Sequence, residues 1–271
     1  MSEQRELSGD DRLDIRQRLA YLVTNLRRNL RLGPGLRVVP YTSRRTEISG
    51  DTASPGRILT DAFIAHQLPT ILAPRPVKVL EIGCGSGSLC AKLADLGYRG
   101  TYVGVDVQDR FNHAEVPGFD RRFILGDAHA FAETGPFDLV VSVSALEHIP
   151  DDGRLINALP GLVAAGGIEL HIVPSGLGLP AYLWHGYRQY TSVSLRERFG
   201  ADGVTVYGFG GLPSFLAHFL LITCGEMLSR LKVRQRFPKA YARLVDLTLR
   251  ADAVIPWGPT MYAVIRQAPA P

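Results

Sequence analysis

The stretch VLEIGCGSG, residues 79–87, carries most of the information about the fold. It joins a short apolar run, Val77 to Ile82, to the helical pattern of Ser86 to Leu96 through three alternating glycines. Glycine is needed where a strand turns tightly into a helix and where the backbone must approach a ligand closely. The stretch therefore predicts a nucleotide-type ligand at the end of a buried strand.

The spacing of these glycines narrows the choice of ligand. A dinucleotide-binding fingerprint, G-x-G-x-x-G, would need its third glycine at position 88, which is Ser88. The sequence instead has Glu81 two residues before Gly83, with Gly85 and Gly87 after it. A carboxylate at this place would repel a pyrophosphate but attract an ammonium group. The pattern therefore favours a ligand that carries an amino group.

Further strand-like runs alternate with helical patterns along the chain. Phe137 to Val143 is a mostly apolar run, which is typical of a strand buried on both faces. Strands separated by helices predict βαβ units, a parallel sheet and right-handed crossovers. The other predicted strands are 101–105, 122–125, 167–173, 204–207 and 261–266.

Two acidic residues follow the next two predicted strands. Asp106 ends the run that begins at Tyr102, and a carboxylate at such a strand tip can accept hydrogen bonds from a ribose diol. Asp127 follows the strand that ends at Leu125, although a Gly-Asp pair is also ordinary turn chemistry. Ligands of open parallel sheets bind at the carboxyl ends of the strands, so both acids are expected near the glycine loop.

In this order, the motifs resemble those of the class I S-adenosylmethionine-dependent methyltransferases. The resemblance is close over residues 77–173 and looser up to residue 266. It implies an α/β, Rossmann-like fold: a seven-stranded, mostly parallel sheet with helices on both faces. It also implies S-adenosylmethionine as the cofactor, and no metal is expected.

The resemblance further implies which residues contact the cofactor. The glycine loop would pass under the methionine part, with Glu81 near the amino group and Val143 facing the same end. Asp106 would hold the ribose hydroxyls, Val107 would pack against adenine, and Asp127 would accept a hydrogen bond from the adenine amino group. The implied cofactor residues are Glu81, Gly83, Cys84, Gly85, Gly87, Asp106, Val107, Gly126, Asp127, Ala128 and Val143.

The run SALEHI, residues 144–149, narrows the resemblance to one subgroup. It looks like the corresponding run of ubiquinone and menaquinone biosynthesis methyltransferases and of many sugar and antibiotic O-methyltransferases. The subgroup implies transfer of a methyl group, by in-line displacement, to a small-molecule acceptor. The expected acceptor atom is a hydroxyl oxygen of a sugar, a polyketide or a quinone-like compound.

Two histidines are the candidate catalytic bases. His148 follows the fourth strand, and an imidazole has a pKa suited to accepting a proton near neutral pH. The alternative role of His148 is a structural histidine that is hydrogen-bonded to loop backbone. Glu147 either orients His148 or caps the following segment, and His185 is the second candidate base.

A polar and aromatic segment, WHGYRQYT at residues 184–191, follows the fifth strand. Similar small-molecule methyltransferases carry such a run in a lid over the acceptor. Tyr187, Arg188 and Tyr190 are therefore the candidate substrate contacts. The alternative is a lid that packs on the core and only excludes water.

The chain divides into an N-terminal helical extension, 1–70, and a cofactor-binding domain, 71–271, with a helical insert at 213–250. A helix is predicted over 10–32, and residues 33–56 read as a loop. The extension would cover the cofactor, line the acceptor pocket or form a dimer contact. The insert would pack on the sheet edge, form a homodimer face, cover the acceptor or lie on a membrane surface.

The composition excludes several classes of protein. With 271 residues, 46% of them hydrophobic and 21% charged, the chain can bury a substantial core. Three cysteines exclude a disulfide-framed scaffold and lack the paired spacing of a zinc site. The sequence has no run of about 18 apolar residues and no apolar leader, so we expect a cytoplasmic protein without a transmembrane segment.

The basic residues are 26 Arg and four Lys, which a GC-rich, bacterial genome explains as well as an anionic partner does. The net charge of +4 is unevenly spread: residues 1–70 carry +3, residues 226–250 carry +5 and the rest carry −4. The positive charge therefore lies on the accessory pieces. This distribution argues against a general nucleic-acid binder.

Two other functions stay open beside a small-molecule methyltransferase. The first is a nucleic-acid or protein methyltransferase. Base N-methyltransferases usually carry an Asn/Asp-Pro-Pro-aromatic run after the fourth strand, where this chain has SVSA at 142–145. The second is a cofactor-binding partner subunit without catalysis. The predicted partner is a small-molecule acceptor, and no nucleic acid is expected.

Overall fold

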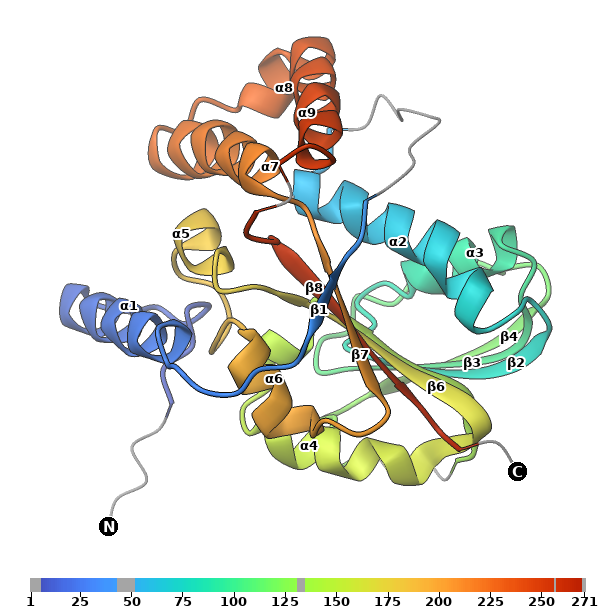
Figure 1. Cartoon of the computed structure of the whole chain (residues 1–271). Coiled ribbons are helices and arrows are strands. Elements are labelled where there is room, and N and C mark those ends of the chain that lie inside the picture. Colours follow the sequence, from blue (N-terminus) through green and yellow to red (C-terminus); the bar gives the residue numbers. More distant parts are fainter. Residues whose placement is uncertain (1–5, 43–51, 131–134, 256, 270–271) are drawn as a thin grey trace.

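An eight-stranded sheet crosses the molecule in the computed structural model, which describes residues 6–42, 52–130, 135–255 and 257–269 (Figure 1). The strand order is β1-β7-β8-β6-β5-β2-β3-β4, and β8 is antiparallel to both of its neighbours. The predicted mostly parallel α/β sheet is confirmed, with one strand more than the expected seven. The strands are β1 Val38–Pro40, β2 Pro76–Ile82, β3 Arg99–Asp106, β4 Phe119–Leu125, β5 Phe137–Val143, β6 Val163–Pro174, β7 Val204–Phe209 and β8 Met261–Gln267.

The additional strand, β1, comes from the part of the N-terminal extension that was predicted to be a loop. It pairs in parallel with β7, from Val38 opposite Val206 to Pro40 opposite Gly208. A three-residue strand that ends in proline is too short to show a period, and proline is tolerated because β1 is an edge strand. This segment becomes a strand because its backbone pairs with the otherwise open edge of β7.

Helices cover both faces of the sheet, with α2 and α3 on one face and α4 and α6 on the other (Figure 1). The α-helices are α1 Ile15–Asn29, α2 Pro55–Ile71, α3 Ser88–Asp95, α4 Asp152–Ala158, α5 Gly178–Tyr182, α6 Ser192–Phe199, α7 Leu212–Ala217, α8 Val233–Arg236 and α9 Pro238–Asp252. Two short 3₁₀ turns, η1 Leu146–His148 and η2 Leu159–Leu162, flank α4, and a π-helical stretch, η3 His218–Leu228, continues α7. No helix in the described ranges is long and apolar enough to cross a membrane.

The core has two layers because successive residues of a strand point to opposite faces of the sheet. Val79 belongs to the layer under α2 and α3, where it shares a buried cluster with Phe63. Leu80, the next residue, belongs to the layer under α4 and α6, together with Leu155 and Phe199. Since both faces are covered, the central strands are apolar on both sides, as the sequence indicated.

The strand order reverses its direction of growth at β2. From β2 the chain adds β3 and then β4 on one side, whereas β5 and β6 lie on the other side. Neighbouring crossovers on opposite sides of such a point leave a crevice beyond the carboxyl ends of the strands. The glycine loop after β2 therefore begins at the place where ligands of open α/β sheets bind.

Candidate functional site

The three glycines of the loop have left-handed backbone, with φ of 68° at Gly83, 53° at Gly85 and 73° at Gly87. A Cβ atom at Gly83 would lie 2.4 Å from the Cβ of Ala145, and one at Gly87 would lie 2.7 Å from the Phe123 ring. A Cβ atom at Gly85 would have no other heavy atom within 4 Å. Two of the glycines are therefore required by packing, while the middle one faces open space.

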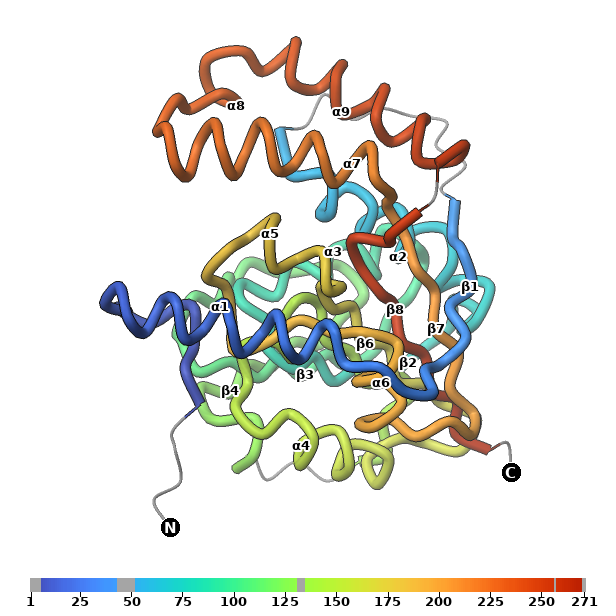
Figure 2. Tube along the Cα trace, turned by 60° about the vertical axis from the view of Figure 1, so that its left-hand side comes forward, coloured from blue at the N-terminus to red at the C-terminus, as the bar shows by residue number. Residues whose placement is uncertain are grey.

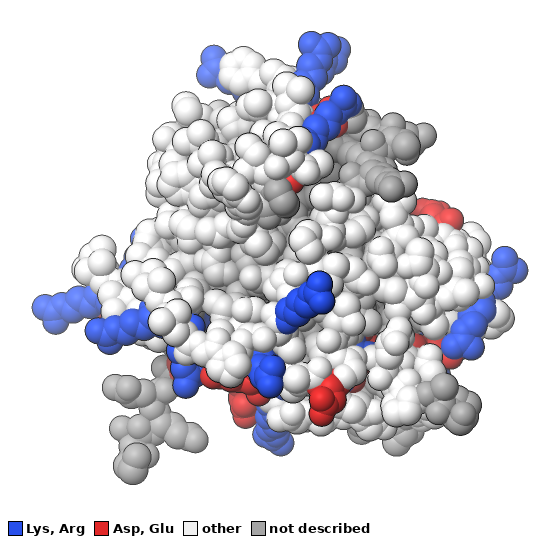
Figure 3. All heavy atoms as spheres, in the orientation of Figure 1, with Lys and Arg blue, Asp and Glu red and all other residues white. Residues whose placement is uncertain are grey.

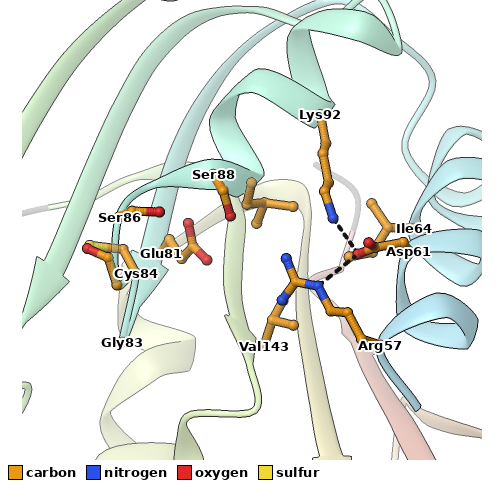
Figure 4. Close-up of a pocket in the computed structure, with 12 residues that line it drawn as sticks. Arg57, Asp61, Ile64, Glu81, Gly83, Cys84, Ser86, Ser88, Lys92 and Val143 are labelled. Carbon is orange, nitrogen blue, oxygen red and sulfur yellow. Dashed lines mark hydrogen bonds and ion pairs between the residues drawn. The ribbon is translucent and has the colours of Figure 1, made fainter. Parts of the chain in front are cut away.

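That space is a cavity of about 240 Å³, which we call the glycine-loop cavity. Its walls come from the loop after β2, from α3, from α2 and from the end of β5 (Figure 4). The predicted residues Glu81, Gly83, Cys84, Gly85 and Val143 all line it. The other lining residues are Arg57, Asp61, Ile64, Ser86, Ser88, Leu89 and Lys92.

Glu81 is a buried carboxyl group at the end of β2. Its Oε2 accepts a hydrogen bond from the Tyr102 hydroxyl, and its side chain is 4% exposed. Burial raises the pKa of Glu81 to about 8, against the opposing effect of the Tyr102 hydrogen bond. Glu81 therefore carries a proton at neutral pH, and an ammonium group beside it would favour the charged form. This fits the amino group of the expected cofactor.

Asp106 at the end of β3 is oriented by the backbone around it. Its Oδ2 accepts from the Gly85 N–H at 2.8 Å and its Oδ1 accepts from the Gln108 N–H at 2.9 Å. Each carboxylate oxygen has two acceptor sites, so both oxygens keep one for a ligand. Val107 follows and is 68% exposed, which leaves a free apolar surface beside the carboxylate. The pair fits a ribose diol and an adjoining flat base.

The remaining predicted cofactor residues lie on the neighbouring strand end and, like Gly87, Asp106 and Val107, do not line the glycine-loop cavity. The Gly126 N–H donates to the backbone oxygen of Asp106 at 2.9 Å, which ties the ends of β3 and β4 together. Asp127 is exposed, and its Oδ1 accepts from the His129 N–H at 2.8 Å. Ala128 is buried beneath it. The structure thus brings the residues predicted from three separate strands to one edge of the sheet.

Three charged residues that the sequence did not single out face Glu81 across the cavity. Arg57 and Asp61 lie one turn apart on α2, and Lys92 lies on α3 (Figure 4). Arg57 Nε is 3.4 Å from Asp61 Oδ1, and Lys92 forms an ion pair with the same carboxylate. The group carries one net positive charge opposite a carboxyl. The two sides together suit a zwitterion such as the amino-acid end of a ligand.

A second cavity of about 130 Å³ adjoins the first, since Arg57 and Val143 line both. Ser144 and Glu147 form the floor beyond β5, and the segment after β6 closes the other side. Its lining residues are Ser54, Gly56, Arg57, Thr60, Val143, Ser144, Glu147, Pro174, Tyr182, His185 and Met261. Of the two predicted bases, His185 lines this cavity and His148 does not.

Glu147 is a buried acid with a free oxygen. It is 1% exposed, and its Oε2 has no hydrogen-bond partner among the described residues. Burial raises the pKa of Glu147 to about 7, although the positive charge of His148 opposes this effect. A carboxyl group with a pKa near 7 is suited to exchange protons at neutral pH.

The two predicted bases, His148 and His185, lie together with ring centroids 4.5 Å apart, but their pKa values shift in opposite directions. His148 Nδ1 is 2.6 Å from Oδ2 of Asp10. Burial works against the charged form of His148, but the hydrogen bond with Asp10 and the negative charges of Glu147 and Asp10 together outweigh it and raise the pKa of His148. Burial and the charge of His148 lower the pKa of His185 to about 4, so His185 is neutral at pH 7.

Asp10 is a partner that sequence reasoning missed, because it lies 138 positions from His148 in an N-terminal segment of unremarkable composition. Glu147, His148 and His185 also offer ligand atoms within 4.8 Å of one another. Imidazole and carboxylate groups are a donor set that divalent transition metals accept. The predicted absence of a metal stays an expectation.

The predicted substrate contacts lie mostly in the interior. Arg188 is 3% exposed, with NH1 2.7 Å from Asp152 Oδ1 and a second ion pair to Glu6. Tyr190 is fully buried and donates to Asp152 Oδ2 at 2.8 Å. Tyr187 is half-buried, and Arg188 lies over its ring. None of the three lines either cavity, so this geometry agrees better with a lid that packs on the core.

Part of the chain is similar in sequence to known methyltransferases. A family model described as a methyltransferase domain matches residues 57–200. The ubiquinone biosynthesis O-methyltransferase of Brucella anthropi is 35% identical over 105 residues, and that of Thiobacillus denitrificans is 31% identical over 97 residues. These matches cover 35% and 33% of this chain and 42% and 41% of the relatives. The chain therefore spans less than half the length of the curated relatives it matches.

Solved structures share the fold at lower sequence identity. The cyclase SpnF is 17% identical with a TM-score of 0.51, and the similarity covers 93% of this chain and 94% of that one. The plantazolicin methyltransferase BpumL, crystallised with a substrate analogue and SAH, is 13% identical with a TM-score of 0.50. That similarity covers 79% of this chain and 85% of BpumL. At these identities the similarity shows the fold alone.

Proposed function

The chain belongs to the class I S-adenosylmethionine-dependent methyltransferases, and from this family we propose that it methylates a hydroxyl oxygen of a small molecule. When bound, the cofactor would supply an electrophilic methyl group on its sulfonium: the acceptor oxygen would form the new O–CH3 bond in line as the S–CH3 bond breaks, and S-adenosylhomocysteine would leave. The protein must hold the acceptor in line with that bond and receive the hydroxyl proton.

The observation that carries this proposal is the junction of the two cavities at Arg57 and Val143. One cavity has the glycine loop and the groups suited to the cofactor. The other has a buried acid, Glu147, and a neutral imidazole, His185. A ligand in the first cavity and an acceptor in the second would therefore meet at the end of β5.

The cofactor would be held by groups at the carboxyl ends of the strands and on the helix that faces them. Glu81 would take its ammonium group and Arg57 its carboxylate, since these side chains face each other across the glycine-loop cavity. Asp106 would accept from the ribose hydroxyls with its remaining acceptor sites. The other predicted contacts, Asp127 and Val107, would hold the adenine.

The proton of the acceptor hydroxyl would pass to Glu147. Its Oε2 is unpartnered among the described residues, it lines the second cavity, and its pKa is raised to about 7. His185, neutral at pH 7, would hold the acceptor by a hydrogen bond. His148 would act as a positioning residue through its charge, since its Nε2 lies 3.9 Å from Glu147 Oε1. The roles of His148 and His185 as bases stay the alternative.

The second cavity also indicates the class of acceptor. Tyr182, Met261 and Pro174 give it apolar and aromatic walls, which suit a ring more than an open polyol. The curated relatives act in ubiquinone biosynthesis as O-methyltransferases, and their acceptor class would fit such walls. We therefore propose a phenolic, quinol-like hydroxyl as the acceptor.

The test is transfer of tritiated methyl groups from labelled S-adenosylmethionine. The purified protein should label a catechol or hydroquinone carrying a short alkyl chain, and Asp106→Ala should bind the cofactor at least tenfold more weakly, since hydrogen bonds to charged groups contribute about 1.5–3 kcal/mol. Label found in the nucleic-acid or protein fraction of a host extract would favour the first alternative function. Cofactor binding without transfer to any fraction would favour a non-catalytic partner subunit.

A further inference from the structure

Helix α1 packs on the protein through its polar side and turns its apolar side outward. Tyr21 and Asn25 are its buried residues. The Tyr21 hydroxyl donates to the backbone oxygen of His185 at 2.8 Å, and Asn29 Nδ2 donates to that of Gly176 at 3.3 Å. A surface helix ordinarily directs its apolar stripe to the core. In α1 this arrangement is reversed.

The outward side of α1 is a continuous apolar stripe. Its spacing of three and four residues places all members within an arc of about 80° on the helix surface. Each is at least 45% exposed, and such a contiguous exposed surface marks an interaction site. The residues of this stripe, which we call the α1 stripe, are Ile15, Leu19, Val23, Leu26 and Leu30.

Basic side chains follow the α1 stripe. Residues 15–31 contain five arginines and no acidic residue. Arg16 and Arg27 fall on the flank of the stripe that points away from the protein body, and both are exposed with no partner among the described residues. Figure 3 shows basic side chains at the projecting end of the molecule, where α1 lies in Figure 1.

We propose that α1 docks on an anionic phospholipid surface. The α1 stripe would enter the boundary between headgroups and acyl chains, and Arg16 and Arg27 would lie among the phosphates. A second copy of the chain is the less favourable occupant, because two α1 stripes packed together would bring Arg16 and Arg27 of both copies close, and neither arginine has an acidic partner among the described residues. An anionic lipid surface satisfies the apolar stripe and the charge together.

The helical insert also exposes apolar residues beside basic ones. Exposed apolar residues of η3 and its neighbours include Leu220, Leu228 and Leu231, next to Arg230 and Lys232. Helix α5 contacts both α1 and η3, and Figures 1 and 2 both show it between them. Tyr182 of α5 lines the second cavity. A lipid surface on α1 would therefore lie close to the residues that surround the proposed acceptor.

The test is co-sedimentation of the whole chain with vesicles of phosphatidylcholine, with and without phosphatidylglycerol. Retention should be stronger on the anionic vesicles and should fall with added salt. Leu19→Gln/Leu26→Gln should lower the partition coefficient about tenfold or more, because two leucines lose their contact with the acyl boundary. Arg16→Gln/Arg27→Gln should lower it about tenfold on anionic vesicles and leave the neutral vesicles unaffected.

The matched control is Arg99→Gln/Arg154→Gln, which removes the same charge from exposed positions outside α1 and the insert. Equal loss of retention in the control and in the Arg16/Arg27 variant would overturn the proposal, as would no retention of the unmodified chain on anionic vesicles. A concentration-dependent dimer that Leu19→Gln/Leu26→Gln abolishes would also overturn it, in favour of a second copy. The assay needs no acceptor, so its outcome is independent of the proposed transfer reaction.

Discussion

At the scale of single residues, burial sets the state of the acids in the site. Glu81 and Glu147 are each less than 5% exposed, and burial raises their pKa to about 8 and about 7. The sequence places Glu81 before the glycine loop and Glu147 beside His148, but no local pattern shows how deeply either side chain is buried. Their chemistry comes from the strand ends and helices that close over them.

Binding of S-adenosylmethionine should release a proton at pH 7. In the protein without cofactor, Glu81 keeps its proton up to a pH of about 8. The ammonium group of a bound cofactor beside it would favour the charged form of the carboxyl group. Calorimetric titration in buffers of different ionisation enthalpy should therefore show release of about one proton per cofactor. Glu81→Gln is the control, because an amide does not titrate. Equal proton release by this variant would contradict the role of Glu81.

Turnover should rise as the pH increases through about 7, because Glu147 must lose its own proton before it can accept one. Glu147→Gln should remove this rising limb of the pH profile of turnover and lower kcat roughly 10²–10⁴-fold. His148→Gln should keep the limb but move it to higher pH, because the charge of His148 lowers the pKa of Glu147. If His148→Gln abolished the limb, His148 would be the base.

Arg57→Gln should weaken binding of S-adenosylmethionine about 10–100-fold, since hydrogen bonds to charged groups contribute about 1.5–3 kcal/mol. 5′-Methylthioadenosine, which lacks the amino-acid part, should bind the variant and the unmodified protein equally. Arg75→Gln, which removes an exposed ion pair with Asp138, should change neither affinity. Equal weakening for both ligands would place Arg57 elsewhere in the cofactor site.

At the scale of helices and strands, long patterns were predicted well and short ones were not. No helix lies between β3 and β4, which residues 107–118 connect. The helix predicted over 10–32 is present as α1 but is shorter at both ends, Ile15–Asn29, and its spacing gave no sign that the apolar side faces outward. A periodic pattern identifies the faces of a helix, and only its neighbours decide which face is covered.

One pair of strands is joined by a buried ion pair whose loss should be measurable. Glu169 of β6 accepts from Arg266 of β8 at 2.7 Å and 3.0 Å, and from His171 at 3.3 Å. Arg266→Met should lower the free energy of unfolding by about 3–5 kcal/mol, because a buried charge loses its partner. The double variant Glu169→Gln/Arg266→Met should recover most of this loss in urea unfolding.

The same pair gives a pH dependence with a definite sign. Burial raises the pKa of Glu169, but the hydrogen bonds and the charges of His171 and Arg266 together outweigh this effect and lower the pKa. Its contribution to stability is therefore complete above the unfolded pKa of about 4.3 and is lost as the pH falls through the lower folded value. Arg266→Met should lose less stability on acidification than the unmodified protein, and a parallel decline in both would contradict this role.

At the scale of the whole molecule, the N-terminal segment is fastened over the site by residues from distant parts of the chain. Glu6 forms an ion pair with Arg188, and Asp10 binds His148 and the Gly186 N–H. These contacts lie beside the second cavity, so the extension and the proposed acceptor site form one unit. The N-terminal extension therefore packs against the proposed acceptor site and does not form a separate unit.

Weakening these contacts should expose the extension to proteolysis. Glu6→Gln/Asp10→Asn should increase the rate of tryptic cleavage within α1 several-fold, because Arg188 and His148 lose the ionic partners that the N-terminal segment supplies. Arg31→Gln, which removes only an exposed ion pair with Glu197, should not change it, since such pairs contribute about 0–1 kcal/mol. Identical cleavage rates for all three proteins would show that the segment is held by other contacts.

The sequence by itself determined the family, the mostly parallel sheet and the cofactor edge. These features depend on local requirements: glycines with positive φ in one loop, apolar runs, and acids at strand ends. Glu81, Gly85 and Val143 therefore stand in one cavity, as predicted. The glycine-loop cavity is the part of the site that the sequence predicted most directly.

Only the tertiary structure decided the partners that come from separate segments. Asp10 beside His148, Arg57 opposite Glu81, and β1 on the edge of β7 each join residues whose own surroundings in the sequence carry no signal. The burial of Arg188 and Tyr190 has the same origin. Contacts between distant segments, and the burial that sets the pKa of a carboxyl group, depend on how the layers pack, and a local pattern does not record that packing.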